Sequence, residues 1–138
     1  MDKSKSPGIR FNQVVLKKSR FERKDMIEEG TPNINVNFNI NNRLNKEKAK
    51  LFTEFTITLG ENDDSPFYLD VSMIGVFSVD NSKKNMDLKE FSENNAPALV
   101  LPYLREYISN TTMRAGLKAP FILPPINVIK MMKEKNKE

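Results

Sequence analysis

The residues best suited to chemistry are a cluster of carboxylates and an amide, Glu61, Asn62, Asp63 and Asp64, in the stretch GENDDS. Carboxylates gathered in this way can bind a cation, but calcium loops need more ligands at a longer and more specific spacing. The stretch is also made of residues that favour tight turns. We therefore expect a solvated hairpin tip here rather than a metal site.

Other catalytic chemistry is poorly represented. The chain has no histidine and no cysteine, which removes the commonest general base and metal ligand, thiolate catalysis and disulfides. It has no glycine-rich phosphate loop. Arg105 and Glu106 have no neighbouring base or nucleophile, which favours an ion pair or interface contact over catalysis. We predict a protein that is not an enzyme and that needs no cofactor or metal.

The positive charge of the chain is modest. Lysine and arginine number 22 against 18 acidic residues, for a formal net charge of +4. A basic run holds Lys17, Lys18, Arg20, Arg23 and Lys24. Because a single aromatic residue, Phe21, lies among these cations, a solvated sheet edge is favoured over a nucleic-acid patch. A small basic nucleic-acid-binding domain remains a secondary alternative.

The length of 138 residues predicts one domain. We expect a flexible tail over residues 1–8, a single domain over 9–128 and a short C-terminal helix and tail over 129–138. No apolar run is long enough to span a membrane, and the polar N-terminus does not resemble a secretory signal. The simplest expected location is the cytoplasm.

Four segments alternate apolar and polar side chains, as half-buried strands do. The clearest covers residues 33–41, where Ile34, Val36, Phe38 and Ile40 alternate with asparagines, and a turn is expected at residues 41–43. Residues 9–22 show a slip in the alternation that predicts a bulge. Residues 51–59 and 67–79 complete the set, with Gly75 bending or breaking the last strand. Consecutive strands with short connections predict an antiparallel meander.

A helix and an apolar loop follow the strands. Pro97 suits the start of a helix and Gly116 its end. One helix face is predicted to bury Leu99, Val100, Tyr103, Leu104, Tyr107, Ile108 and Thr111. The loop then holds Leu117, Phe121, Ile122, Leu123 and Ile126 among Pro120, Pro124 and Pro125. Loops are normally polar, so this one must cover or bind something. Strands first and helices last predict an α+β fold.

Three segments of the sequence resemble the SecB family of bacterial protein-export chaperones. They are IGVFSV at residues 74–79, LVLPYLREYIS at 99–109 and LPPINV at 123–128. The resemblance implies a four-stranded antiparallel sheet packed with a long helix, and a homotetramer built as a dimer of dimers. It also implies ATP-independent holding of unfolded preproteins for export, with the motor protein SecA as partner.

The resemblance further implies an apolar groove that takes up extended, unfolded polypeptides. Its expected lining is Val36, Phe38, Phe67, Tyr107, Leu117, Phe121, Ile122, Leu123 and Ile126. Burial of apolar area at about 25 cal/mol per Å² would supply the binding energy. Binding would therefore require no specific sequence in the bound polypeptide.

In the family, carboxylates on the exposed sheet face bind the tail of SecA. By motif, Glu22, Tyr68 and Asp70 correspond to this docking face, while Lys18 stands where an acid is expected. A charge reversal there would repel a basic partner. The family has a second branch, in which a SecB-like chaperone protects the antitoxin of a toxin–antitoxin module. The sequence leaves both branches open.

Overall fold

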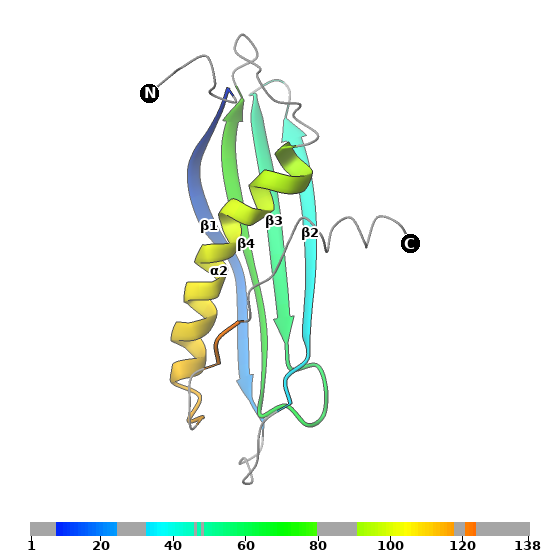
Figure 1. Cartoon of the computed structure of the whole chain (residues 1–138), viewed down its shortest axis with the longest axis vertical. Helices are drawn as coiled ribbons and strands as arrows, with labels where there is room; N and C mark the ends of the chain where they lie inside the picture. Colours follow the sequence, from blue (N-terminus) through cyan, green and yellow to red (C-terminus); the bar gives the residue numbers. More distant parts are fainter. Residues whose placement is uncertain are drawn as a thin grey trace.

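The computed structural model describes residues 8–24, 33–45, 47, 49–79, 91–117 and 121–123. Its strands are β1 (Ile9–Arg23), β2 (Val36–Asn45), β3 (Lys50–Leu59) and β4 (Phe67–Val79). A short π-helix, η3 (Phe91–Asn95), leads directly into the long helix α2 (Ala96–Met113). The strands form one layer and α2 lies obliquely across one face of it (Figure 1). The predicted antiparallel sheet with a long helix is confirmed.

The strands follow the order β1-β4-β3-β2, and every neighbouring pair is antiparallel. Strands β2, β3 and β4 form the expected meander. β1, however, pairs with β4 and not with β2, so β1 and β2 occupy opposite edges of the sheet. The lengths suit this order, because β1 with 15 residues and β4 with 13 pair along nearly their whole length.

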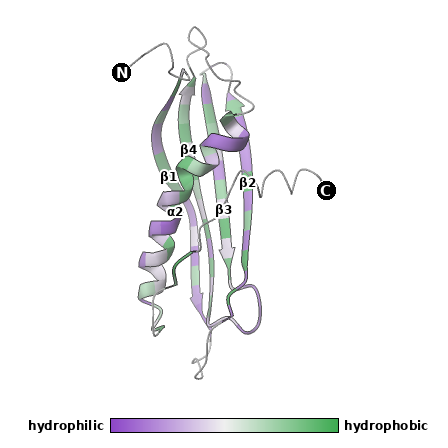
Figure 2. Cartoon of the chain, in the orientation of Figure 1, coloured by the Kyte–Doolittle hydropathy of each residue, from purple (hydrophilic) through white to green (hydrophobic). Residues whose placement is uncertain are grey.

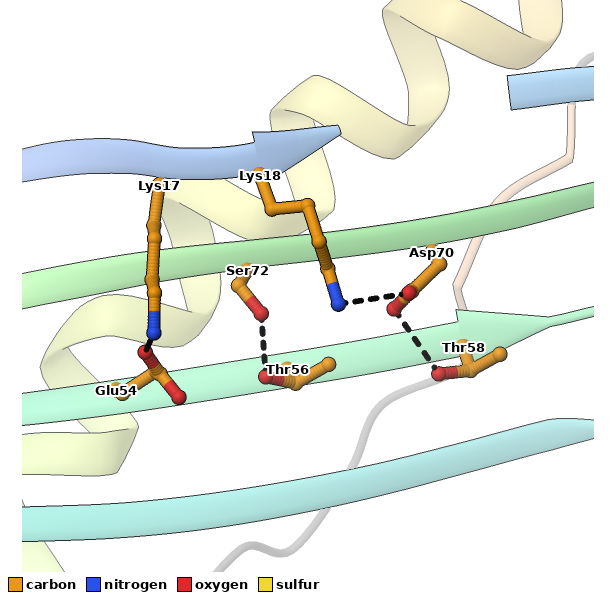
Figure 3. Close-up of polar contacts among 7 residues, drawn as sticks. All are labelled: Lys17, Lys18, Glu54, Thr56, Thr58, Asp70 and Ser72. Carbon is orange, nitrogen blue, oxygen red and sulfur yellow. Dashed lines mark hydrogen bonds and ion pairs between the residues drawn. The ribbon is translucent and has the colours of Figure 1, made fainter. Parts of the chain in front are cut away.

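The slip in the alternation of β1 appears as two irregularities in its pairing with β4. The register shifts between Phe11 and Gln13 and again between Leu16 and Lys18. Asn12 and Lys17 are therefore extra residues, as in β-bulges. Because of the bulge at Lys17, the side chains of Lys17 and Lys18 both point to the face of the sheet away from α2 (Figure 3).

The core lies between α2 and the sheet face that it covers, which we call the inner face. In β3 the alternate residues Leu51, Thr53, Phe55, Ile57 and Leu59 are all buried. The banding of hydrophilic and hydrophobic residues along the strands reflects this period of two (Figure 2). Helix α2 contributes Val100, Leu101, Leu104 and Ile108 to the same core.

The buried face of α2 is rotated from the predicted one. Leu99 and Tyr103 are 42% and 50% exposed, and Tyr107 is only half-buried. Leu101 and Thr112 are buried in their place. The helix carries more apolar residues than one sheet contact can cover, so periodicity alone could not choose among them.

Two local predictions about the strands were wrong. Strand β2 does not turn at Asn41 but continues to Asn45, opposite Lys50. Thr53 donates a hydrogen bond to the Asn42 side chain, which itself donates one to the Ser92 carbonyl in η3. Gly75 does not break β4. A Cβ atom there would lie 2.5 Å from Cγ2 of Val100, so glycine permits the close approach of α2 to the strand.

The charged loop and the basic run have structural roles. Gly60, with φ +79°, opens the GENDDS turn, and Asn62 bonds to Asn33 and Asn35. Lys24 donates to the carbonyls of Gly60 and Asn62 at 2.8 and 2.7 Å. These hydrogen bonds confirm a structured turn at this end of the sheet.

Several predictions concern residues outside the described part of the chain. They are Ile126, the tail over residues 1–7 and the C-terminal helix from residue 129. Within the described residues, no helix is long and apolar enough to cross a membrane. The same residues contain no group of three or more acidic side chains that could hold a metal ion.

Candidate polypeptide-binding surface

The oblique path of α2 leaves part of the inner face beyond the helix. The helix starts above β2 and β3, where η3 ends, and finishes beside β1 (Figure 1). On β2, Val36, Phe38 and Ile40 point to the inner face opposite Leu59, Ile57 and Phe55 and are only half-buried. The Phe38 and Phe55 rings lie 6.1 Å apart. The alternation on β2 thus places an apolar row at an edge strand.

The segment after α2 adds further apolar side chains, which lie nearer to β4 than to β2. The Phe121 ring lies 6.2 Å from the Phe67 ring and is half-buried, and Leu117 is also half-buried. Ile122 is 71% exposed, whereas Leu123 is 1% exposed. Val36, Phe38, Leu117, Phe121 and Ile122 keep surface toward solvent, and we call these five residues the apolar strip. Phe67 and Leu123 belong to the core beneath it.

Tyr107 does not join the apolar strip, although the sequence analysis grouped it with Val36 and Phe38. Its hydroxyl is hydrogen-bonded to that of Ser19 on β1. Strands β4 and β3 separate β1 from β2, which is about 14 Å at the usual strand spacing. Tyr103, one turn earlier, packs its ring edge-to-face against Phe11, also on β1. This flank of α2 therefore faces β1.

Arg105 lies on the opposite flank of α2 and was missed as a candidate site residue. It precedes Thr112 by seven residues, or about two helical turns, so both lie on the same side of the helix. The Thr112 hydroxyl is 3.4 Å from the Phe121 carbonyl oxygen. Arg105 Nε is buried without a hydrogen-bond partner. Glu106 does not pair with it but accepts a hydrogen bond from Asn110. In the sequence, the only indication of a role for Arg105 was a positive charge next to apolar positions of the helix.

The outer face of the sheet, which points away from α2, is polar and carries ion pairs (Figure 3). Lys18 Nζ lies 2.9 Å from an Asp70 carboxylate oxygen, and Thr58 donates a weaker hydrogen bond to Asp70 at 3.3 Å. Lys17 pairs with Glu54, and the hydroxyls of Thr56 and Ser72 bond to each other. The hydrogen bond to Asp70, together with its negative charge, raises the pKa of Lys18 above its usual value.

The residues of the predicted docking face lie together but do not form a free acidic surface. Glu22 is opposite Tyr68, and Arg20 is opposite Asp70, in the pairing of β1 with β4. Arg20 lies 3.3 Å from Glu22, with its guanidinium carbon 5.7 Å from the centre of the Tyr68 ring. Because Lys18 neutralises Asp70 and Arg20 neutralises Glu22, the two carboxylates present little net negative charge to a partner.

Comparisons with known proteins agree with the fold. The sequence matches the family of the preprotein translocase subunit SecB over residues 2–138. A protein of Methanocaldococcus jannaschii is 36% identical over 143 residues, covering 95% of this chain and 90% of that protein. The protein-export protein SecB of Azoarcus is 28% identical over 134 residues, covering 92% and 87%. The chain therefore belongs to the SecB family of chaperones.

A solved structure shares the architecture at low sequence identity. It is the SecB-like chaperone of Mycobacterium tuberculosis in complex with a peptide from an antitoxin. The TM-score is 0.68 at 15% identity, covering 86% of this chain and 87% of that chain. At this identity the match supports the four-stranded sheet and long helix alone.

Proposed function

We propose that this protein is an ATP-independent cytoplasmic holdase that binds unfolded polypeptides, without catalysis and without a cofactor. The observation that carries the proposal is the apolar strip, in which Ile122 is largely exposed and Phe121 and Val36 are half-buried. Contiguous exposed apolar side chains mark interaction sites on soluble proteins. Membership of the SecB family supports an unfolded client, and export of preproteins is the corresponding cellular role.

The strip suits an unfolded client better than a folded one. Its residues come from an edge strand and from a separate segment after the helix, so they are spread apart rather than gathered in one compact pocket. Binding there would be driven by burial of apolar area, at about 25 cal/mol per Å². Any extended chain with apolar or aromatic residues could therefore bind favourably. Arg105, on the same side of α2 as Thr112, would donate hydrogen bonds to backbone carbonyl oxygens of the client.

A dedicated antitoxin chaperone is the second candidate. One observation on this chain favours it: Lys18 neutralises Asp70 on the face that the family uses to bind SecA. A chaperone of this kind would keep the apolar strip and have no need of an acidic face. In a titration with SecA, Lys18→Asp should raise the affinity if this face is the docking surface. An unchanged affinity would assign SecA binding, if any, to another surface.

We also propose that the chain forms a homotetramer. Leu99, Tyr103 and Met113 along α2 keep much of their side-chain surface exposed to solvent. Exposed apolar residues in a stripe on a helix are typical of subunit contacts. Four chains of 15.9 kDa give about 64 kDa, which light scattering would detect directly.

An aggregation assay tests the holdase proposal. A denatured, slow-folding protein is diluted into buffer with a near-stoichiometric amount of this chain, without ATP, at two salt concentrations. We expect suppression at both, because apolar binding depends weakly on salt, whereas a nucleic-acid-type surface would depend on it steeply. Ile122→Asp and Phe121→Asp should abolish suppression, and the exposed Asn41→Asp on the outer face of β2 should not.

The variants also separate the candidates. Ile122 is exposed, so its replacement should leave the thermal melting curve unchanged. If Ile122→Asp and Phe121→Asp both suppress aggregation as well as the parent, the apolar strip is not the client site. If the parent itself fails to suppress aggregation but binds one antitoxin peptide tightly, the antitoxin candidate replaces the general holdase.

A further inference from the structure

Positive charge on the outer face is concentrated at one end of the sheet. Arg10 on β1 and Lys50 on β3 both lie opposite Ser78 of β4, so they flank it in one row across the strands. In the next row Arg43 on β2 lies opposite Phe52. Adjacent rows are about 7 Å apart, and Arg10 and Lys50 are separated by two strand spacings, or about 10 Å. We call Arg10, Arg43 and Lys50 the basic end.

The carboxylates of the strands on this face lie elsewhere and already have partners. Glu54 lies opposite Ile74, in the second row from Ser78, and pairs with Lys17. Asp70 and Glu22 lie in rows still farther from Ser78 and pair with Lys18 and Arg20, respectively. Among the residues that the structure describes, no carboxylate lies within 4.0 Å of the cations of the basic end. On the described strands, the basic end therefore carries three cations without an ion-pair partner, although the net charge of the chain is modest.

Apolar side chains lie directly beside the basic end. Val15 is 42% exposed and sits opposite Ile74, which is half-buried, in the row after that of Phe52. The Arg43 guanidinium carbon lies 5.0 Å from the centre of the Phe52 ring, in a cation–π contact. An apolar patch of Val15, Phe52 and Ile74 thus lies on the outer face, where Glu54 is opposite Ile74 and pairs with Lys17.

We propose that the basic end, with this patch, is a docking surface for an acidic polypeptide segment that carries apolar residues between its carboxylates. Charge complementarity selects an acidic partner, and the aliphatic patch adds apolar contact. Nucleic acid fits less well, because bases stack on open aromatic rings. The Phe52 ring is already in contact with the Arg43 guanidinium. This surface lies on the opposite side of the sheet from the apolar strip, so the inference does not rest on the proposed client site.

Fluorescence anisotropy with the full chain tests the proposal. The probe is a labelled twelve-residue peptide of repeated Asp-Leu-Asp-Ser units, and the comparison probes are its lysine counterpart and a single-stranded oligothymidylate of the same length. We expect the acidic peptide to bind, more weakly as salt is added. Arg43→Gln combined with Lys50→Gln should weaken binding about tenfold, as expected from the loss of two charge-assisted contacts.

Matched variants distinguish the basic end from general charge. Lys18→Gln combined with Arg20→Gln removes the same charge from the other end of the same face and should change the affinity less than twofold. Phe121→Asp, in the apolar strip, should have no effect. Arg43→Glu combined with Lys50→Glu should reverse the preference toward the lysine peptide, a gain that unfolding cannot produce.

Three results would overturn the inference. Equal losses in the two glutamine pairs would show that only net charge matters. Tighter binding of the oligothymidylate than of the acidic peptide would assign the surface to nucleic acid. Loss of acidic-peptide binding in Phe121→Asp would place the peptide in the apolar strip.

Discussion

Lys18 and Asp70 form an ion pair of 2.9 Å across β1 and β4, at the position where the family leads one to expect two acids. The pair exists because the bulge at Lys17 brings Lys18 to the outer face opposite Ser72, within reach of the next row. The pair leaves this part of the outer face locally neutral. The charge at one residue, rather than the fold, thus sets the electrostatic character of this face.

The Lys18–Asp70 pair should make stability depend on pH in the alkaline range. The pKa of Lys18 is raised in the folded protein, first by its hydrogen bond to Asp70 and then by the charge of Asp70. The contribution is therefore complete below the unfolded lysine pKa of about 10.4 and is lost as pH rises through the folded pKa. Thermal melts of the parent and Lys18→Gln should differ at pH 8 and converge above that range. A difference that persists would show that the pair is not the cause.

Gly75 should be intolerant of a side chain. Gly75→Ala places a Cβ atom 2.5 Å from Val100 Cγ2, and overpacking of this kind costs about 1–3 kcal/mol. Urea denaturation would measure the loss. In Val100→Ala the obstructing methyl groups are absent, so adding Gly75→Ala to it should cost clearly less than in the parent. Equal costs in the two backgrounds would mean that the helix does not limit this position.

Arg105 should contribute little to stability. Its Nε is buried without a hydrogen-bond partner, and such groups oppose folding. Arg105→Met keeps the apolar stem, so we expect the free energy of unfolding to stay constant or to rise by about 1 kcal/mol. Arg114→Met, which removes a hydrogen bond to the Asn110 carbonyl, is the control. A loss above about 1 kcal/mol in Arg105→Met would mean that the guanidinium has a stabilising partner.

The exposed side of α2 should be needed for assembly but not for folding. Leu99→Ser combined with Tyr103→Ser should lower the mass in solution by light scattering, because both side chains are largely exposed in the single chain. The far-ultraviolet circular dichroism should keep its shape. Asn110→Ser, also exposed on α2 but polar, should keep the parent mass. An unchanged mass in the double variant would place the subunit contact elsewhere.

Local patterns predicted much of the fold. Alternation located the four strands and the buried face of β3, and the slip in residues 9–22 predicted the irregularity in β1. The same reasoning could not choose between Leu99 and Leu101 on α2, because both continue an apolar stripe and only the position of the sheet decides. Alternation also predicted that β2 ends at Asn41. The strand continues because Asn42 accepts a hydrogen bond from Thr53 and donates one to Ser92, and both partners come from other parts of the chain.

The candidate site was less predictable for the same reason. Phe121 and Val36 were identified by their apolar character, but the grouping of Tyr107 with them assumed which flank of α2 faces β2. The compensation of Asp70 by Lys18 required both the β1–β4 pairing and the bulge. Neither the pairing nor its bulge can be predicted from the sequence of one strand, because the order of strands in the sheet decides which strands pair.

The two extra residues of β1 also bear on how this strand can change length. A one-residue deletion in a regular strand turns every following side chain to the other face. Because Asn12 and Lys17 are accommodated as bulges, removal of either would restore regular pairing and leave Phe11, Val14 and Phe21 on the inner face. A first strand shorter by one residue at either position would therefore fit the same sheet with the same residues on each face.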